Sequence, residues 1–394
     1  MDEEEYIKQR LREADEQSMA FERCRHLPIN PRKVVFTAIE GTTGFTCNPK
    51  YIALELLRRN RDYDIVWLVN DMTKEFPAGI RKVENTLENR AFELSTAKVW
   101  IDNSRKQLEV RKRPGQVYLQ TWHAKLGFKP TCFDRGASFS RIAQLVSQHD
   151  SDLIDYVLSN SDWYDKTLPK GMLYAGPVLR TGSPRCDVLV NRTEKERDEV
   201  RRRFGLPRDA RIMMYAPTFR GGSQGIERKL GEDSHSPDYG RLVKALESRF
   251  GGRWYVFLRL HPQMTVRHIE SHAQAERLVD VSKIDDMYEI LAGCDAFLTD
   301  YSSSAFDAAV MGIPVLIYSD DYGEYEAERG KLLWNLRELP FPLAETNEEL
   351  AKSLATFDEQ IYRDKLERLF QETGVVEDGH ASERVADWIE ERLQ

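Results

Sequence analysis

From residue 33 onward, short apolar runs alternate with longer amphipathic segments. The runs are rich in β-branched and aromatic residues, which is typical of buried strands. The amphipathic segments, such as KYIALELLRR at 50–59, have the period of helices. Continuous apolar strands separated by helices indicate a parallel sheet with both faces covered. In the first half of the chain we predict strands at KVVFTA (33–38), YDIVWLVN (63–70), KVWIDN (98–103), VYLQTW (117–122), YVLSNS (156–161) and MLYAG (172–176).

A second series of the same kind follows a segment at 181–210 in which glycines and prolines surround a charged helix. We place a domain junction there, because 394 residues exceed the usual size of one core. The sequence therefore predicts an α/β protein with two doubly wound, Rossmann-like domains facing a cleft, the GT-B architecture. The predicted domains are residues 1–190 and 191–380, with a helix at 381–394 that packs back on the first. The second series of strands is IMMYAPTF (212–219), WYVFLRLHP (254–262), AFLTDYSS (296–303) and PVLIYS (314–319).

The first 26 residues predict a polar helix at 5–26 with scattered apolar positions. Its first turn is acidic, so we expect it to dock on its own domain rather than on a membrane. The opening MDEEEY is unlike a secretory signal, and no apolar run approaches the roughly 20 residues of a membrane span.

Composition narrows the class of protein. With 41% hydrophobic and 31% charged residues, the chain resembles a soluble globular enzyme. A net charge of −8 gives no case for nucleic-acid binding. The five cysteines lie far apart with no CxxC spacing, so we expect a reducing cytoplasm and no zinc site. A basic cluster at 105–113 has two interpretations: a solvated surface, or a patch that binds anionic membranes.

Polar residues stand where several predicted strands end. Ligands of open parallel sheets bind beyond the carboxyl ends of the strands, so these positions are candidates for chemistry. A lone histidine is more often structural, but two histidines at strand ends with arginines beside them favour an active site. The strand ends deliver His123, then Pro217, Thr218 and Arg220, then Arg259 and His261, and finally Asp300, Tyr301, Ser302, Ser303 and Ser304.

The serine run precedes a predicted short helix, SAFDAAVMG. A helix N-terminus offers unpaired N–H groups and partial positive charge, and hydroxyls add donors suited to phosphate oxygens. The alternative is simple N-capping by Ser303 or Ser304. Together with Arg220, Arg259 and His261, the run predicts a diphosphate cradle. The chain has no GxxxxGK[ST], and EGTTGF at 40–45 does not match GxGxxG; we expect it to be a flexible loop beside an acceptor.

Five blocks of sequence, in this order and spacing, resemble the CDP-glycerol glycerophosphotransferase family. These are QTWHAKLGFKP, TGSPRCD, YAPTFR, LRLHP and DMYEILAGCDAFLTDYSSSAFDAAVMGIPVLIY. The family comprises teichoic acid primases and polymerases and their capsule-making relatives. The resemblance covers about residues 33–330. It implies a GT-B fold and transfer of an alditol phosphate, glycerol phosphate first, from a CDP-alditol to a hydroxyl of a lipid-linked acceptor or growing polymer, releasing CMP.

The resemblance also implies roles for individual residues. His123 matches the histidine assigned as catalytic base, and His261 matches a second catalytic histidine near the donor phosphates. Ser302, Ser303 and Asp307 match donor-binding positions, while Trp122 and Lys125 fall in the motif on the acceptor side. Where the family reads WHG[TS]PLK, this chain reads WHAKLG at 122–127, so the acceptor's identity is open.

Phosphoryl transfer needs positioning and charge stabilisation more than covalent work by protein groups. A neutral histidine suits the hydroxyl proton, and cationic groups offset charge on the departing CMP, so we expect no metal and no cofactor. Because the two histidines lie on different domains, closure would assemble the site. The expected partners are CDP-glycerol or CDP-ribitol, a polyprenyl-linked acceptor and an anionic membrane surface, with the protein cytoplasmic and peripheral at the inner face of the cell membrane.

Two other functions stay open. A GT-B glycosyltransferase would share the fold and the cradle but would move a sugar from a nucleotide sugar. A non-catalytic paralogue would bind CDP-alditols or polymer without turnover. The products separate them: CMP for phosphoryl transfer, a nucleoside diphosphate for sugar transfer, and neither for a binding protein.

Overall fold

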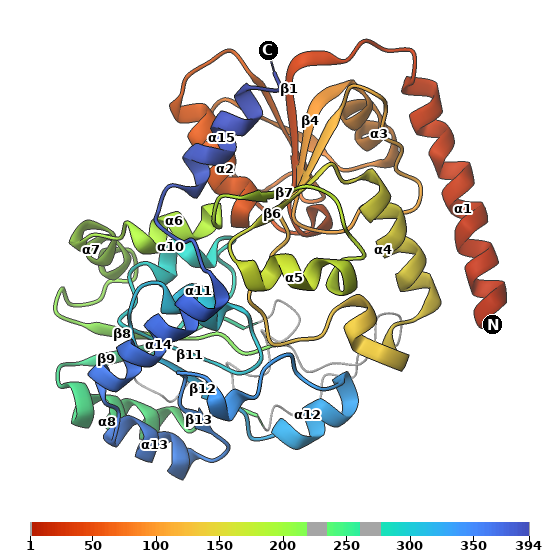
Figure 1. Cartoon of the computed structure of the whole chain (residues 1–394). Helices are drawn as coiled ribbons and strands as arrows, with labels where there is room; N and C mark the ends of the chain where they lie inside the picture. Colours follow the sequence, from red (N-terminus) through yellow and green to blue (C-terminus); the bar gives the residue numbers. More distant parts are fainter. Residues whose placement is uncertain (1, 219–234, 261–276, 394) are drawn as a thin grey trace. The chain divides into compact units, whose positions relative to one another are not determined.

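A computed structural model describes residues 2–218, 235–260 and 277–393 (Figure 1). The chain divides into two compact units. Unit 1 contains Met1–Lys125, Thr131–Asp187 and Gly374–Gln394, and unit 2 contains Leu126–Pro130 and Val188–Thr373. The sequence placed the corresponding boundaries at 190 and 380.

Unit 1 is built on a seven-stranded sheet in the order β3-β2-β1-β4-β5-β6-β7. Every neighbouring pair is parallel, and the central strands are buried along most of their length, as their continuous apolar sequences predict. The strands are β1 (Asn30–Thr37), β2 (Asp64–Val69), β3 (Ile80–Glu84), β4 (Ala97–Asp102), β5 (Val117–Gln120), β6 (Tyr156–Ser159) and β7 (Val178–Arg180).

Helices cover both faces of this sheet (Figure 1). One core contains side chains of α2 and α15 on the strands, and the other contains side chains of α1, α3 and α5. The first helix therefore docks on its own unit through Phe21, as predicted, and packs against α3. The helices are α1 (Glu3–Cys24), α2 (Cys47–Arg58), α3 (Leu87–Thr96), α4 (Arg141–Leu153), α5 (Asp162–Gly171) and α15 (Ala381–Glu390), with 3-10 turns η1 (Ile39–Gly41), η2 (Cys132–Ser138) and η3 (Pro184–Cys186). The short helix α6 (Asp187–Val190) begins at the last residue of the stretch Thr131–Asp187 and continues into unit 2.

A buried ion cluster lies against the same sheet. Lys33, at 3% exposure, pairs with Glu93, at 4% exposure. Arg81 also bonds Glu93, through two nitrogens. A buried charge that loses its partner destabilises the fold, so this cluster constrains the packing of α3 on β1 and β3.

Unit 2 is built on a six-stranded sheet in the order β10-β9-β8-β11-β12-β13, again with every pair parallel. The segment Leu126–Pro130 belongs to this unit: Phe128 is fully buried, its ring lies 4.9 Å from that of Phe306, and its carbonyl accepts a hydrogen bond from Leu333 N. The strands are β8 (Arg211–Tyr215), β9 (Trp254–Leu258), β10 (Leu278–Asp280), β11 (Ala296–Thr299), β12 (Val315–Tyr318) and β13 (Leu343–Ala344).

One face of the second sheet packs against α8 and α13, whose leucines join a core with Trp254 and Leu298. No helix in the described part of the chain is long and apolar enough to cross a membrane. The helices of unit 2 are α7 (Glu194–Arg203), α8 (Tyr239–Phe250), α10 (Met287–Leu291), α11 (Ser304–Ala309), α12 (Tyr322–Arg329), α13 (Asn347–Ala355) and α14 (Glu359–Thr373), with the 3-10 turn η4 (Leu336–Glu338).

The strand predicted at MLYAG is wrong, because this segment is a turn and the strand is the next one along, β7. Leu173 has a positive φ of 55°, which no strand accommodates. The hydroxyl of Tyr174 donates to Pro177 O at 2.7 Å, which fixes the turn. The sequence analysis also missed β3, β10 and β13, which are edge strands and are short or have few buried residues.

Each sheet has one place where the strand order reverses. In unit 1 the chain runs outward from β1 to β2 and β3 and then returns to β4, so the reversal lies between β1 and β4. In unit 2 it lies between β8 and β11 for the same reason. Such switch points leave a crevice at the carboxyl ends of the strands, where open α/β sheets bind ligands.

Candidate functional site

His123 stands just beyond β5, at the carboxyl edge of the first sheet. Its side chain is exposed, and its Nδ1 lies 2.8 Å from the carbonyl oxygen of Asn103. A carbonyl only accepts hydrogen bonds, so in the neutral imidazole Nδ1 carries the proton and the basic lone pair is on Nε2. The contact thus orients the ring and fixes the tautomer that a general base requires.

The loop after β4 presents this carbonyl. Asp102 holds the loop by accepting hydrogen bonds from the backbone N–H groups of Asn103 and Ser104 at 2.7 and 2.9 Å. The side chain of Asn103 accepts a hydrogen bond from Ile39 N at 2.7 Å, so the same residue touches the loop after β1 and the His123 ring. These contacts bring the strand ends on either side of the switch point together with His123.

The EGTTGF segment begins in a constrained turn rather than the flexible loop that the sequence predicted. Ile39 and Glu40 have φ of 45° and 56°, a left-handed conformation that is unfavourable for side chains of this size. Hydrogen bonds from their N–H groups to the side chains of Asn103 and Ser104 hold them there. Strain maintained in this way is common beside functional sites.

Two buried side chains hold the backbone that carries His123. Asn48, fully buried near the start of α2, donates to the carbonyls of Thr121 and Trp122 at 3.4 and 3.0 Å. Arg185, in η3, donates to the carbonyl of His123 at 2.6 Å, and its own N–H donates to Asn48 at 3.2 Å. Because Trp122 has a φ of 48°, these bonds fix a residue that would otherwise favour another conformation.

The predicted acceptor-side residues differ in their contacts. The ring of Trp122 lies 4.5 Å from that of His123 and beneath the guanidinium of Arg105 at 5.3 Å, so it belongs to this group. Lys125 is 3% exposed, and its ammonium donates to the carbonyls of Thr121 and Leu158 inside unit 1. These contacts give Lys125 a structural role, and they do not support its predicted place beside an acceptor.

The basic cluster at 105–113 is also largely neutralised within unit 1, which does not support the predicted membrane patch. Arg105 pairs with Asp150 at 3.1 Å, and its side chain is 11% exposed. Lys106 is 5% exposed and pairs with Asp102 at 2.5 Å, and Lys112 pairs with Asp155 at 2.6 Å.

In unit 2, Asp300 ties the two sides of the switch point together. It follows β11 and is 1% exposed, and its carboxylate accepts hydrogen bonds from the backbone N–H and the hydroxyl of Thr218, which follows β8. The next residue, Tyr301, is fully buried, donates to Asp321 at 2.7 Å and stacks on Tyr325 with ring centroids 3.8 Å apart. The two residues before the serine run are therefore fixed by contacts with the segment after β8 and with the segment after β12.

The serine run sits where this loop enters α11. Ser303 is the N-cap residue, yet its side chain makes no capping hydrogen bond. The hydroxyls of Ser302 and Ser304 lie 2.7 Å apart. Asp307 is 5% exposed and accepts a hydrogen bond from the Tyr288 hydroxyl at 2.6 Å. N-capping therefore does not account for Ser303, and a donor-binding role for the run stays a prediction.

Arg259 has other partners than the predicted phosphates. Its guanidinium donates to the carbonyls of Val281 and Ser282 at 2.9 Å and also bonds those of Ile284 and Asp285. Burial lowers the pKa of Arg259, with nearby aspartates opposing the shift. The side chain holds the loop after β10, and these contacts do not support a phosphate-binding role. The other predicted cations, Arg220 and His261, lie outside the described residues.

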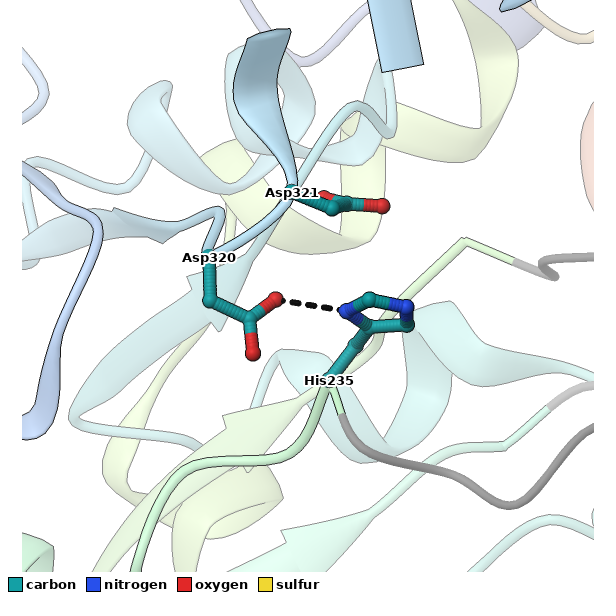
Figure 2. A group of neighbouring side chains, drawn as sticks. All are labelled: His235, Asp320 and Asp321. Carbon is teal, nitrogen blue, oxygen red and sulfur yellow. Dashed lines mark hydrogen bonds and ion pairs between the residues drawn. The ribbon is translucent and has the colours of Figure 1, made fainter. Parts of the chain in front are cut away.

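One group in unit 2 has the residue types of a metal site. Figure 2 shows His235 beside Asp320 and Asp321, which follow β12; one ligand atom from each lies within 4.8 Å of the others. Nδ1 of His235 is 2.8 Å from Asp320, an ordinary hydrogen bond, and Asp321 already accepts from Tyr301. These bonds account for the arrangement, so we assign the group no role in the chemistry.

Sequence reasoning missed three residues that shape the candidate site: Asn48, Asn103 and Arg185. A signal existed for each. Asn48 is a poor helix former near the start of a helix, Asn103 ends a predicted strand, and Arg185 stands inside the TGSPRCD block. Their roles depend on carbonyl groups of distant segments, which a sequence does not reveal.

The chain matches a known family over nearly its whole length. Residues 19–391 match the family described as CDP-Glycerol:Poly(glycerophosphate) glycerophosphotransferase. The chain therefore belongs to this family, which confirms the resemblance seen in the sequence blocks.

Individual relatives of this chain carry names that agree with the family description. The teichoic acid glycerol-phosphate transferase of Staphylococcus aureus is 26% identical, over 97% of this chain and 99% of that protein. The teichoic acid poly(glycerol phosphate) polymerase of Staphylococcus epidermidis is also 26% identical, over 93% of this chain and 51% of its own length. The chain thus spans about half the length of this polymerase and of its Bacillus subtilis counterpart.

A solved structure of the wall teichoic acid polymerase TagF, a variant soaked with CDPG, matches this chain with a TM-score of 0.81 at 25% identity. The match covers 96% of this chain and 94% of that chain. Together with the two parallel sheets, it confirms the predicted α/β, GT-B fold class. The cleft between the domains stays a prediction.

Proposed function

We propose that this protein transfers an alditol phosphate, most simply glycerol phosphate, from a CDP-alditol to a hydroxyl of a lipid-linked acceptor or growing teichoic or capsular polymer. The observation that carries the proposal is the orientation of His123 by Asn103, beside the switch point of unit 1, in a chain of this family. Glycerol is favoured because two relatives of nearly equal length are named a glycerol-phosphate transferase and a poly(glycerol phosphate) polymerase. Ribitol is the alternative, since other relatives are named ribitol-phosphate polymerases.

In the proposed reaction, Nε2 of His123 accepts the proton of the acceptor hydroxyl as its oxygen attacks the β-phosphorus of the donor. The new bond joins the acceptor oxygen to this phosphorus, and the bond between the phosphorus and the CMP oxygen breaks. CMP leaves with the bonding electrons. Neutral imidazole is suited to this proton near pH 7, and the bond from Nδ1 to Asn103 stabilises the imidazolium that forms.

The donor is proposed to bind at the switch point of unit 2. The hydroxyls of Ser302 and Ser303 lie on a loop that Asp300 and Tyr301 hold rigidly, as donors for phosphate oxygens must be held. His261 and Arg220 are proposed to offset the charge on the leaving CMP. No step is assigned to Arg259 or Lys125.

A polyprenyl-linked acceptor would place the protein at the cytoplasmic face of a membrane as a peripheral protein. The cluster at 105–113 does not support this placement, because Arg105, Lys106 and Lys112 pair within unit 1.

The test is an incubation with CDP-glycerol, CDP-ribitol and a panel of nucleotide sugars, each with a lipid-linked acceptor, followed by mass analysis of both products. We expect CMP together with an acceptor heavier by one or more alditol phosphates. His123→Ala should lose most of this transfer. Its matched control is His380→Ala, because His380 is also an exposed histidine of unit 1 and bonds Glu383 at the start of α15. A nucleoside diphosphate product would indicate sugar transfer, and donor binding without turnover of any substrate would indicate a binding protein.

A further inference from the structure

A cavity of about 350 Å³ lies at the edge of the second sheet opposite the serine run. Arg211 and Trp254, which begin β8 and β9, line it, together with Asp295, which directly precedes β11. Strands of a parallel sheet share one direction, so these residues mark its amino edge, whereas Thr218 and Asp300 mark its carboxyl edge. A strand of five residues spans about 17 Å, which separates the cavity from the candidate donor site.

The walls of the cavity carry more positive than negative charge. Four arginines line it (Arg192, Arg197, Arg211 and Arg363), against two acidic residues, Asp295 and Glu359. Asp295 is already neutralised twice, by Arg197 at 2.6 Å and by Arg201 at 2.8 Å.

Two of these arginines have no carboxylate partner among the described residues. Arg192 is half-buried, and its guanidinium donates to Cys294 O at 2.8 Å. Burial and the neighbouring Arg197 lower the pKa of Arg192, as expected for a cation without a counter-ion. Arg211 lies 5.8 Å from the ring centroid of Trp254. Arg211 is exposed, so the cost of desolvation applies to the half-buried Arg192, whose guanidinium is costly to desolvate unless an anion compensates it.

We propose that this cavity binds a phosphate-bearing anion, separately from the donor site. A guanidinium matches phosphate oxygens with two parallel N–H groups, and the aromatic walls formed by Phe250, Trp254 and Phe357 would cover the uncharged part of such a ligand. The volume is at the small end of ligand pockets, which suits one phosphate group with a short alcohol rather than a whole nucleotide. The phosphate is either free or part of a phosphodiester chain, and the chemistry of recognition is the same.

The test is calorimetric titration of the full chain with inorganic phosphate and, in a second arm, with a short glycerol phosphate oligomer, each with CDP present to occupy the donor site. The variants are Arg192→Gln, Arg211→Gln and the double substitution. The control is Arg208→Gln, which removes an exposed arginine of the same unit that pairs with Asp198 outside the cavity.

We expect saturable, salt-sensitive binding of at least one probe, weakened by about 10- to 100-fold for each cavity arginine removed and unchanged by Arg208→Gln. Binding of phosphate itself supports a free ligand, and binding of the oligomer alone supports a phosphodiester chain. The melting temperature shows whether the variants are folded. In phosphate-free buffer Arg192→Gln should melt no lower than wild type, and it should lose the increase in melting temperature that the probe gives the wild type. Absence of saturable binding to the wild type, or wild-type binding by the folded double variant, overturns the proposal. Neither result depends on transferase activity, so the proposed function stands or falls separately.

Discussion

Asn48→Ala tests whether the shape of the His123 loop matters for the reaction. The substitution removes a fully buried amide and leaves the carbonyl of Trp122, its partner at 3.0 Å, without this donor. Leaving a buried group unsatisfied costs about 1–3 kcal/mol. The left-handed conformation of Trp122, with φ of 48°, stores roughly 1–2 kcal/mol that then favours other loop conformations. Because this strain is present in the wild type too, the change caused by the substitution is the lost hydrogen bond alone, about 1–3 kcal/mol, which shifts the loop equilibrium away from the native conformation by roughly 5- to 150-fold.

We therefore expect kcat to fall about tenfold or more, with the KM for the CDP-alditol nearly unchanged, because the candidate donor residues lie in unit 2. The assay is steady-state transfer at saturating acceptor, with the intrinsic fluorescence of the variant as a report on the loop. The matched control is Asn89→Ala, which removes an amide that donates to Glu84 O on the surface of the same unit. If kcat of folded Asn48→Ala stays within twofold of wild type, the loop conformation does not limit the reaction.

Three further predictions follow from the same geometry. His123→Ala should lower transfer by about 10²–10⁴-fold while CDP binding persists, and near-normal turnover would remove His123 from the mechanism. Ser302→Ala combined with Ser303→Ala should weaken the donor, since each bond to a charged group is worth about 1.5–3 kcal/mol; equal CDP affinity in calorimetry would leave the serines a structural role only. Glu93→Gln should lower the free energy of unfolding by about 3–5 kcal/mol at pH 7, because it leaves the buried ammonium of Lys33 without its carboxylate, while the exposed Arg81 keeps Asp64. Burial alone would raise the pKa of Glu93, but hydrogen bonds from its two cations lower it overall, so its stabilisation is complete above the unfolded-state pKa and is lost as pH falls through the folded one. Urea titrations should accordingly show that the difference in free energy of unfolding between wild type and Glu93→Gln disappears below about pH 4. A difference that does not change with pH would contradict this.

The pattern of apolar runs predicted the central strands of both sheets because a strand buried on both faces must be apolar throughout. The pattern did not predict strands that are not buried on both faces. β3 has no buried residue, and β13 has only two residues, so neither carries a continuous apolar signal. MLYAG carries the signal without the strand, because its apolar side chains serve the core from a turn that Leu173 makes with a positive φ.

For the candidate site, the ends of the predicted strands showed where the site residues lie, but they did not show which groups the side chains bond. Thr218 and Asp300 lie at the switch point of unit 2, and His123 follows β5, the strand next to the switch point of unit 1, where the rule for parallel sheets predicts ligands. Lys125 and Arg259 have the same chemistry, but they bond carbonyls of their own units. Only the positions of those carbonyls distinguish a structural cation from a binding one, and they depend on tertiary contacts.

The division of unit 1 into separated stretches of sequence has a consequence for how the protein is made. The core on one face of the first sheet contains Val385, Trp388 and Ile389 from α15, and these follow the whole of unit 2 in the chain. During synthesis on the ribosome, this face of the sheet is therefore covered only in part, by α2, until α15 has emerged. We expect ribosome-arrested chains ending at residue 373 to have a protease-sensitive unit 1, and addition of a synthetic peptide of residues 374–394 to restore resistance. Full resistance of the arrested chain without the peptide would show that the first sheet matures before its last helix exists.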